Sequence, residues 1–112
     1  MTAPVSRPNI TLQSGDALLL VDVQKDFLSG GALAVPRGDE VVPVLNHCLN
    51  KFQKRSLPSY ASRDWHPPDH CSFTEQGGPW PAHCVQTTEG AQFSDALVLP
   101  KSVEIISKAW MP

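Results

Sequence analysis

Side chains that could take part in acid–base or metal chemistry occur in four short stretches of this chain. Asp22 follows an apolar run, Asp64 and His66 stand two residues apart, His83 follows Trp-Pro-Ala, and Lys108 comes after another short apolar stretch. A carboxylate with imidazoles can bind a metal ion, and a lysine beside an aspartate can keep that aspartate ionised for proton transfer. These residue types indicate a metal centre next to a general base.

The stretch from Asp64 to His83 is the candidate metal site. Side chains two residues apart point the same way in an extended segment, so Asp64 and His66 can reach one ion. The same stretch holds His70 and Glu75, which makes five potential ligands. Nitrogen and carboxylate ligands suit zinc, iron or manganese. We expect a divalent transition metal, most simply zinc; the alternative interpretation is that the histidines are solvated loop residues.

Asp22 interrupts a run that we expect to be buried, and a buried carboxylate is costly unless it is paired or bound. One interpretation is structural, because an aspartate at the end of a strand often caps the next helix. Lys108 at the end of another strand favours the second interpretation, in which Asp22 is ionised and takes part in proton transfer.

Aromatic residues and one cysteine flank these polar groups. Phe27, Trp65 and Trp80 could form the walls of a pocket for a flat heterocycle, with core packing as the alternative. Cys84 is next to His83, but a free cysteine is more often a small buried hydrophobe than a reactive thiolate, so we assign it no catalytic role. The three cysteines include no CxxC pair, which argues against a disulfide framework or a thiolate zinc cluster.

The composition is that of one small globular domain. The 112 residues are 41% hydrophobic, and nine Lys and Arg against eleven Asp and Glu give a formal net charge of -2. No basic stripe suggests nucleic acid, and no apolar run is long enough to span a membrane. We therefore expect a small-molecule partner and a cytoplasmic location.

Hydrophobic patterns predict the elements that position the reactive residues. Residues 1–15 are predicted to form an N-terminal arm and residues 16–112 one α/β domain. The uninterrupted apolar run 17–23 is typical of a central parallel strand covered on both faces. Helical spacing predicts a helix over 39–54 with Asp39 as its cap. Further strands are predicted over 57–62 and 103–107, separated by a long connection over 67–100 that is rich in Pro and Gly.

Strand, helix and strand followed by a second crossover predict an open parallel sheet with flanking helices, a Rossmann-like three-layer α/β architecture. Ligands of such folds bind beyond the carboxyl ends of the strands. Asp22, Asp64, His66 and Lys108 all fall at these ends, so we expect them to form one site.

Four collinear motifs resemble the nicotinamidase branch of the isochorismatase-like cysteine hydrolases. They are Asp22-Val-Gln-Lys-Asp-Phe27, Ser62-Arg-Asp64-Trp-His66-Pro, Trp80-Pro-Ala-His83-Cys84 and Ser107-Lys108. The resemblance implies hydrolysis of nicotinamide to nicotinate and ammonia, as part of pyridine nucleotide salvage. It also implies residue roles: Asp22 as general base, Lys108 stabilising the charges around it, Asp64, His66 and His83 as metal ligands, His70 or Glu75 as an extra ligand, and Phe27 and Trp80 lining the nicotinamide pocket.

The chain departs from this family at the nucleophile. In the family a nucleophilic cysteine follows a later strand, at the start of a helix, and no cysteine follows Lys108 here. The family's strand order also leaves the first strand at a sheet edge, where a bare apolar strand is an aggregation hazard. We therefore expect the sequence to be the front part of a longer protein. The alternatives are a non-catalytic fragment that binds metal, ligand or partner, association or homo-oligomerisation through the uncovered edge, and a hydrolase of another small amide.

Overall fold

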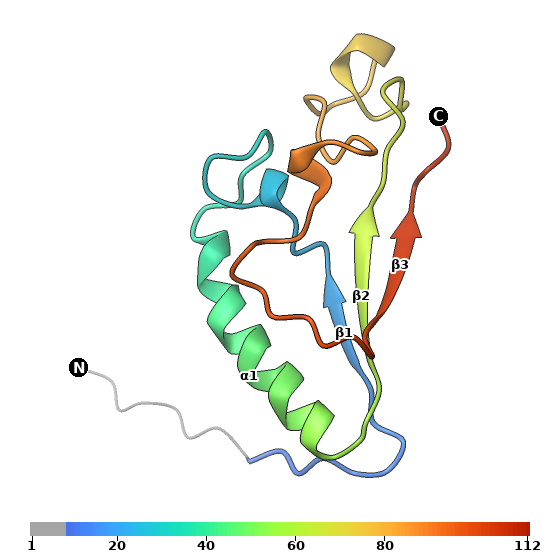
Figure 1. Cartoon of the computed structure of the whole chain (residues 1–112). Coiled ribbons are helices and arrows are strands. Elements are labelled where there is room, and N and C mark those ends of the chain that lie inside the picture. Colours follow the sequence, from blue (N-terminus) through green and yellow to red (C-terminus); the bar gives the residue numbers. More distant parts are fainter. Residues whose placement is uncertain (1–8) are drawn as a thin grey trace, which may run out of the picture.

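A computed structural model describes residues 9–112, so part of the predicted N-terminal arm lies outside the described residues. Three strands, β1 (Leu18–Val21), β2 (Ser59–Asp64) and β3 (Glu104–Lys108), form one parallel sheet in the order β1-β2-β3 (Figure 1). Helix α1 (Val41–Lys54) connects β1 to β2, and a long connection leads from β2 to β3. The predicted open parallel α/β sheet is confirmed.

Helix α1 forms where apolar residues recur at intervals of three and four. Val42, Leu45, Leu49 and Phe52 lie on one stripe, and Val42 and Leu49 are buried against the sheet residues Leu20 and Ala61. Lys51 and Lys54 stand in the last turn, where positive charge suits the helix dipole. None of the helices in the described part of the chain is long and apolar enough to cross a membrane.

The prediction that Asp39 caps this helix is wrong. A single turn of 3-10 helix, η2 (Gly38–Glu40), precedes α1, and Glu40 takes the N-cap position without a side-chain cap bond. The Asp39 carboxylate instead accepts a hydrogen bond from the Ser29 amide at 2.8 Å. It therefore ties the loop after β1 to the start of the helix.

Strand β2 begins two residues later than predicted. The Leu57 amide donates to the Phe52 carbonyl at 2.9 Å, so Leu57 completes the C-terminal turn of α1 rather than joining the sheet. The strand extends instead to Asp64, which pairs with Lys108 of β3. This shift places both charged residues at the same edge of the sheet.

Only one face of the sheet is covered within residues 9–112. Leu20 and Ala61 are buried beneath α1 and the returning segment around Leu97, whereas Leu19 on the opposite face is 57% exposed and Val21 60%. Strand β1 lies at the edge of the sheet. The prediction of a central strand covered on both faces is therefore wrong for the described residues, because Leu19 and Val21 stay exposed and none of residues 9–112 pairs with the outer edge of β1.

The connection from β2 to β3 contains no strand, as predicted, and only two single turns of 3-10 helix, η3 (Thr74–Gln76) and η4 (Glu89–Ala91). Isolated bridges fasten it to itself, His66 with Val85 and Phe73 with Trp80, and to the segment after β1, Gln24 with Phe93. Figure 1 shows its first part beyond the carboxyl ends of the strands, so that it lies over the predicted site.

Candidate metal centre and acid–base pair

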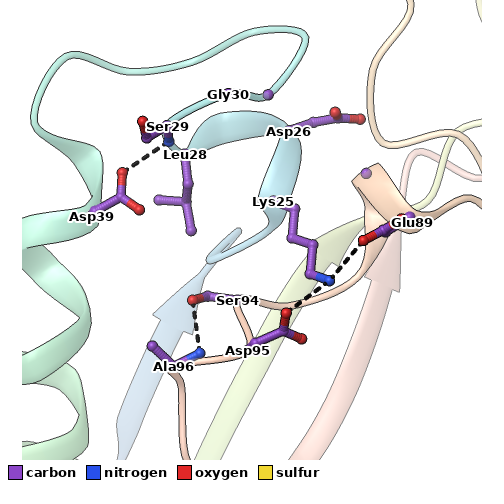
Figure 2. A pocket seen from close by; sticks show the side chains of 12 residues that line it. Lys25, Asp26, Leu28, Ser29, Gly30, Asp39, Glu89, Ser94, Asp95 and Ala96 are labelled. Atoms are coloured by element: carbon purple, nitrogen blue, oxygen red, sulfur yellow. Dashed lines mark hydrogen bonds and ion pairs between the residues drawn. The ribbon is translucent and has the colours of Figure 1, made fainter.

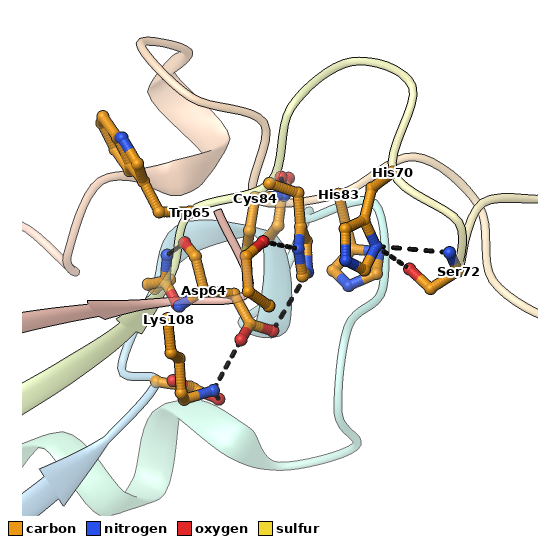
Figure 3. A network of polar contacts seen from close by, with 12 residues as sticks. Asp64, Trp65, His70, Ser72, His83, Cys84 and Lys108 are labelled. Carbon is orange, nitrogen blue, oxygen red and sulfur yellow. Dashed lines mark hydrogen bonds and ion pairs between the residues drawn. The ribbon is translucent and has the colours of Figure 1, made fainter. Parts of the chain in front are cut away.

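Three charged residues from the three strands meet at the carboxyl edge of the sheet. The Lys108 ammonium donates to Asp22 Oδ2 at 2.9 Å and, as Figure 3 shows, to Asp64 Oδ1 at 2.5 Å. Asp22 follows β1 directly and has a left-handed backbone, with φ of 56°, which ends the strand at this point. The residues predicted to meet here are thus brought together by the ends of parallel strands.

Lys108 remains positively charged in this setting. Burial by itself would lower the pKa of Lys108, but its hydrogen bonds with Asp22 and Asp64 and the negative charges of both carboxylates outweigh burial and raise it. The ammonium therefore compensates the charge of two carboxylates that stand on neighbouring strands.

Asp64, His66 and His83 form a group that fits a metal ion. Each residue offers one ligand atom, and these atoms all lie within 4.8 Å of one another. His66 and His83 are both 4% exposed, and His66 Nε2 lies 3.4 Å from Asp64 Oδ2. Nitrogen and oxygen donors at such spacing suit zinc or a related divalent ion.

The other ring nitrogen of each histidine is held by the backbone. His66 Nδ1 lies 3.0 Å from the Ala109 carbonyl oxygen, and His83 Nδ1 lies 2.8 Å from that of Pro81. A carbonyl oxygen only accepts, so Nδ1 is the donor in each contact, and in the neutral ring Nε2 is the nitrogen that can bind a metal. This is the arrangement of metal-binding histidines, whose second nitrogen donates to a carbonyl or carboxylate.

The two candidates for an extra ligand differ in position. The His70 ring stacks on the His66 ring with centroids 4.0 Å apart, and its Nδ1 lies 2.7 Å from Ser72 Oγ. Burial, with the neighbouring His66, lowers the pKa of His70 and favours the neutral imidazole that binds metals. Glu75 is exposed on η3 and does not belong to the three-residue group.

Aromatic side chains surround the histidines. Phe73 is buried with its ring 5.6 Å from that of His66 and 5.4 Å from that of His83. Phe27 lies 5.6 Å from the His83 ring, whereas Trp80 is half exposed. The Trp65 ring instead packs under the Arg63 guanidinium, 3.8 Å from its centroid, so this residue takes part in a cation–π contact.

Cys84 has the environment of a structural residue. Burial, followed by the charges of Asp26 and Asp64, raises the pKa of its thiol to about 12, so the thiol is protonated at neutral pH. Its amide donates to Asp26 Oδ2 at 2.8 Å, and its carbonyl accepts from the His66 amide at 2.9 Å. All three cysteines are free thiols, as predicted.

Two residues of the site were not singled out from the sequence, Gln24 and Asp26. Both lie in the loop after β1, and their side chains bind backbone groups of Asp64 and Cys84. Their sequence signal was their place in the motif Asp22-Val-Gln-Lys-Asp-Phe27, which directly follows an apolar strand. Spacing gives no indication of a side chain that binds backbone.

A hollow of about 570 Å³ lies beside the site rather than in it (Figure 2). The Lys25 ammonium lies within it and pairs with Glu89 at 3.3 Å and Asp95 at 3.2 Å. Asp39, on its opposite wall, is bound to the Ser29 amide. These polar groups are satisfied by one another, so the hollow presents no convergent set of free ligand-binding groups.

A family model described as the isochorismatase domain matches residues 16–111. The chain is similar to the nicotinamidase of Escherichia coli (strain K12), with 47% identity over 96 residues that cover 72% of this chain and 45% of that relative. It is also similar to the nicotinamidase/pyrazinamidase of Mycobacterium tuberculosis, with 39% identity over 84 residues that cover the same shares of the two chains.

Solved structures agree with this similarity. The pyrazinamidase of Pyrococcus horikoshii in complex with zinc superposes with a TM-score of 0.81 and 52% identity, over 84% of this chain and 51% of that one. PnC1 from L. infantum in complex with nicotinate superposes with a TM-score of 0.83 and 38% identity, over 92% and 52%. The chain spans about half the length of the relatives that it matches.

Proposed function

Because this chain belongs to the isochorismatase domain family, we propose that it supplies the metal centre and the acid–base pair of a nicotinamidase. The reaction is hydrolysis of nicotinamide to nicotinate and ammonia. One observation carries the proposal: Lys108 binds both Asp22 and Asp64, and Asp64 lies with the buried His66 and His83 in a group of three residues that could hold a metal ion. A general base and a metal centre are thereby joined through one charged side chain.

We propose that Asp64, His66 and His83 hold a divalent transition metal, with His70 as the extra ligand. The proximity of His70 to His66 supports this choice over the exposed Glu75. Zinc is favoured over iron and manganese because a similar structure is described in complex with zinc. Such an ion, when bound, polarises a carbonyl oxygen or lowers the pKa of water.

Asp22 would act as the general base of the reaction. Its side chain is 21% exposed and faces Lys108, so a proton from a reacting group can reach it while the ammonium balances the local charge. Phe27 beside His83 and the half-exposed Trp80 would form the walls of the nicotinamide pocket. Aromatic walls favour the binding of a flat heterocycle because offset stacking adds to the burial of apolar area.

The nucleophile would come from another part of the family fold. Cys84 is buried with a raised pKa, and the metal-ligand group includes neither Cys71 nor Cys48. The relatives are about twice as long as the part that this chain matches. We propose that turnover depends on a cysteine in the part of the fold that the chain does not span.

A chimera tests the proposal. Residues 16–111 would replace the matching segment of the 47% identical E. coli nicotinamidase, and ammonia release from nicotinamide would be measured. We expect activity in the zinc-loaded chimera and a loss of at least about 100-fold with Asp22→Asn, because general base catalysis contributes on that scale. A matched control is Asp69→Asn on the exposed connection. A folded, metal-loaded chimera that releases no ammonia would contradict the proposal.

A second candidate function is partner binding through β1. Leu19 and Val21 form an apolar surface beside the edge of this strand that residues 9–112 leave unpaired, and this edge can pair with a further strand. This would allow a homo-oligomer or a complex without turnover. Light scattering at rising concentrations distinguishes the two candidates, since a monomer with an active chimera favours the enzyme. As an enzyme, the protein would act in pyridine nucleotide salvage in the cytoplasm.

A further inference from the structure

Gln24 is a fully buried polar residue whose side chain grips the backbone of a metal-ligand residue. Its Oε1 accepts a hydrogen bond from the Asp64 amide at 2.9 Å, and its Nε2 donates to the Asp64 carbonyl at 2.8 Å. The second Nε2 proton goes to the Ala91 carbonyl at 2.9 Å. The carboxamide thus uses both donors and one acceptor, and two of its three bonds go to a single residue.

These bonds take the place of backbone hydrogen bonds that β1 would otherwise make to Asp64. The Asp22 amide still donates to the Ser62 carbonyl at 3.1 Å, but the Asp22 carbonyl accepts from the Gln24 amide at 2.8 Å instead of from Asp64. The left-handed turn at Asp22 has taken the backbone of β1 away from β2. Asp64 would therefore lie beyond the β1 ladder, and the Gln24 side chain binds the backbone groups left free there.

Asp26 does the same for the other side of the centre. Its carboxylate accepts from the Cys84 amide at 2.8 Å and from the Ala32 amide at 3.2 Å. Cys84 has a left-handed backbone, with φ of 48°, and stands between two ligand residues: it follows His83 in the chain, and its carbonyl accepts from the His66 amide. Fixing Cys84 therefore fixes the backbone beside both histidines.

Close packing holds Asp26 in place. A Cβ added to Gly90 would lie 2.2 Å from Asp26 Oδ2, so only glycine leaves room for the carboxylate at this point. Gly90 lies in η4 next to Ala91, whose carbonyl binds Gln24. One short helical turn thus contacts both side chains.

We infer that Gln24 and Asp26 are positioning residues of the metal centre: Gln24 fixes Asp64, and Asp26 fixes Cys84 between His66 and His83. The inference rests on the proposed function in taking these three residues as ligands. Residues that orient metal ligands typically change metal affinity by about 10–100-fold when they are replaced. Neither side chain touches the reacting groups, and both act through the backbone of the ligand residues.

The test measures zinc affinity of the 112-residue chain by competition with a chromophoric chelator, well below the unfolding temperature. Gln24→Met keeps the size of the side chain and removes all three hydrogen bonds, and Gly90→Ala displaces Asp26 without altering any ligand. We expect each to weaken zinc binding by about 10–100-fold. We also expect the visible spectrum of the cobalt-substituted protein to change, because the ligand geometry changes.

Two controls separate positioning from stability. Gln53→Met makes the same chemical change on the exposed surface of α1 and should leave zinc affinity unchanged. Leu49→Ala opens a cavity under α1, far from the centre, and should lower the unfolding temperature while zinc affinity stays within about twofold. Folded Gln24→Met and Gly90→Ala variants that bind zinc like these controls would overturn the inference.

Hydrogen exchange covers the case in which Gln24→Met does not fold. In the unaltered chain the Asp64 and Cys84 amides should exchange at least about 100-fold more slowly than an open amide, since the first donates to the buried Gln24 and the second to the half-buried Asp26. Exchange of both at the open rate would also overturn the inference. An unaltered chain that does not bind zinc would refute the metal centre itself. If the chimera is inactive while Gln24→Met and Gly90→Ala still weaken zinc binding, only the amidase reaction is refuted.

Discussion

Two neighbouring leucines of β1 should respond very differently to truncation. Leu20 is 1% exposed within the core cluster, so Leu20→Ala loses the transfer free energy of its side chain and leaves a cavity, at a cost of about 3 kcal/mol. Leu19 is 57% exposed, and burial of the remaining 43% of a side chain worth about 2 kcal/mol gives a cost near 1 kcal/mol for Leu19→Ala. Any loss of strand propensity is common to both variants.

Urea denaturation followed by tryptophan fluorescence measures this difference. With a slope of about 1.5 kcal/mol per molar urea, Leu20→Ala should lower the midpoint by about 2 M and Leu19→Ala by less than about 1 M. Each variant is compared at two protein concentrations. If Leu19→Ala and Leu20→Ala cost the same free energy of unfolding at both concentrations, the claim that this sheet face is open would be refuted. If the cost of Leu19→Ala grows with protein concentration, a second chain covers this face.

Three other results are expected. Asp64→Asn should lower zinc affinity by more than about 100-fold, which exceeds the effect expected for a residue that only positions a ligand. His47→Ala on α1 should leave zinc affinity unchanged. Equilibrium dialysis measures both. Burial raises the pKa of the Cys84 thiol from 9.0 to about 12, so the thiol of the unfolded chain loses its proton at a lower pH than that of the folded chain. The free energy of unfolding should therefore fall as pH rises from 9 to 12, by up to about 1.4 kcal/mol per pH unit. Cys84→Ala should remove this slope in urea titrations over the same pH range. In the chimera, Trp80→Ala should raise KM for nicotinamide by about tenfold with a small change in the unfolding midpoint, because its ring is half exposed; an unchanged KM would remove Trp80 from the pocket.

The convergence of Asp22, Asp64 and Lys108 could be predicted because parallel strands carry their carboxyl ends to one edge. An apolar run and a helical stripe were sufficient to locate the first strand and the helix, whereas the strand order came from the family resemblance and β2 was placed two residues too early. That error came from Leu57, whose apolar side chain suggested a strand while its amide completes the turn of α1. The choice between His70 and Glu75 required the path of the connection, which has no periodicity.

The positions of Gln24, Asp26 and Phe73 could not be predicted for a different reason. Their contacts depend on left-handed turns at Asp22 and Cys84, and residues other than glycine give little sequence signal for such turns. A side chain that binds backbone has no required partner type, so no pairing rule identifies it. The sequence indicated the candidate metal ligands but not the side chains that bind the backbone beside them.

The position of the two histidines on the connection has a consequence for the polymer physics of the chain. His66 stands at its beginning and His83 further along, so an ion bound to both would close a loop over residues 67–82. Cross-linking a loop of this size lowers the entropy of the unfolded chain by the equivalent of about 3 kcal/mol. Metal binding would then act as a reversible cross-link of the connection between β2 and β3, which contains no strand. Proteases should therefore cleave the loop over residues 67–82 faster in the metal-free chain.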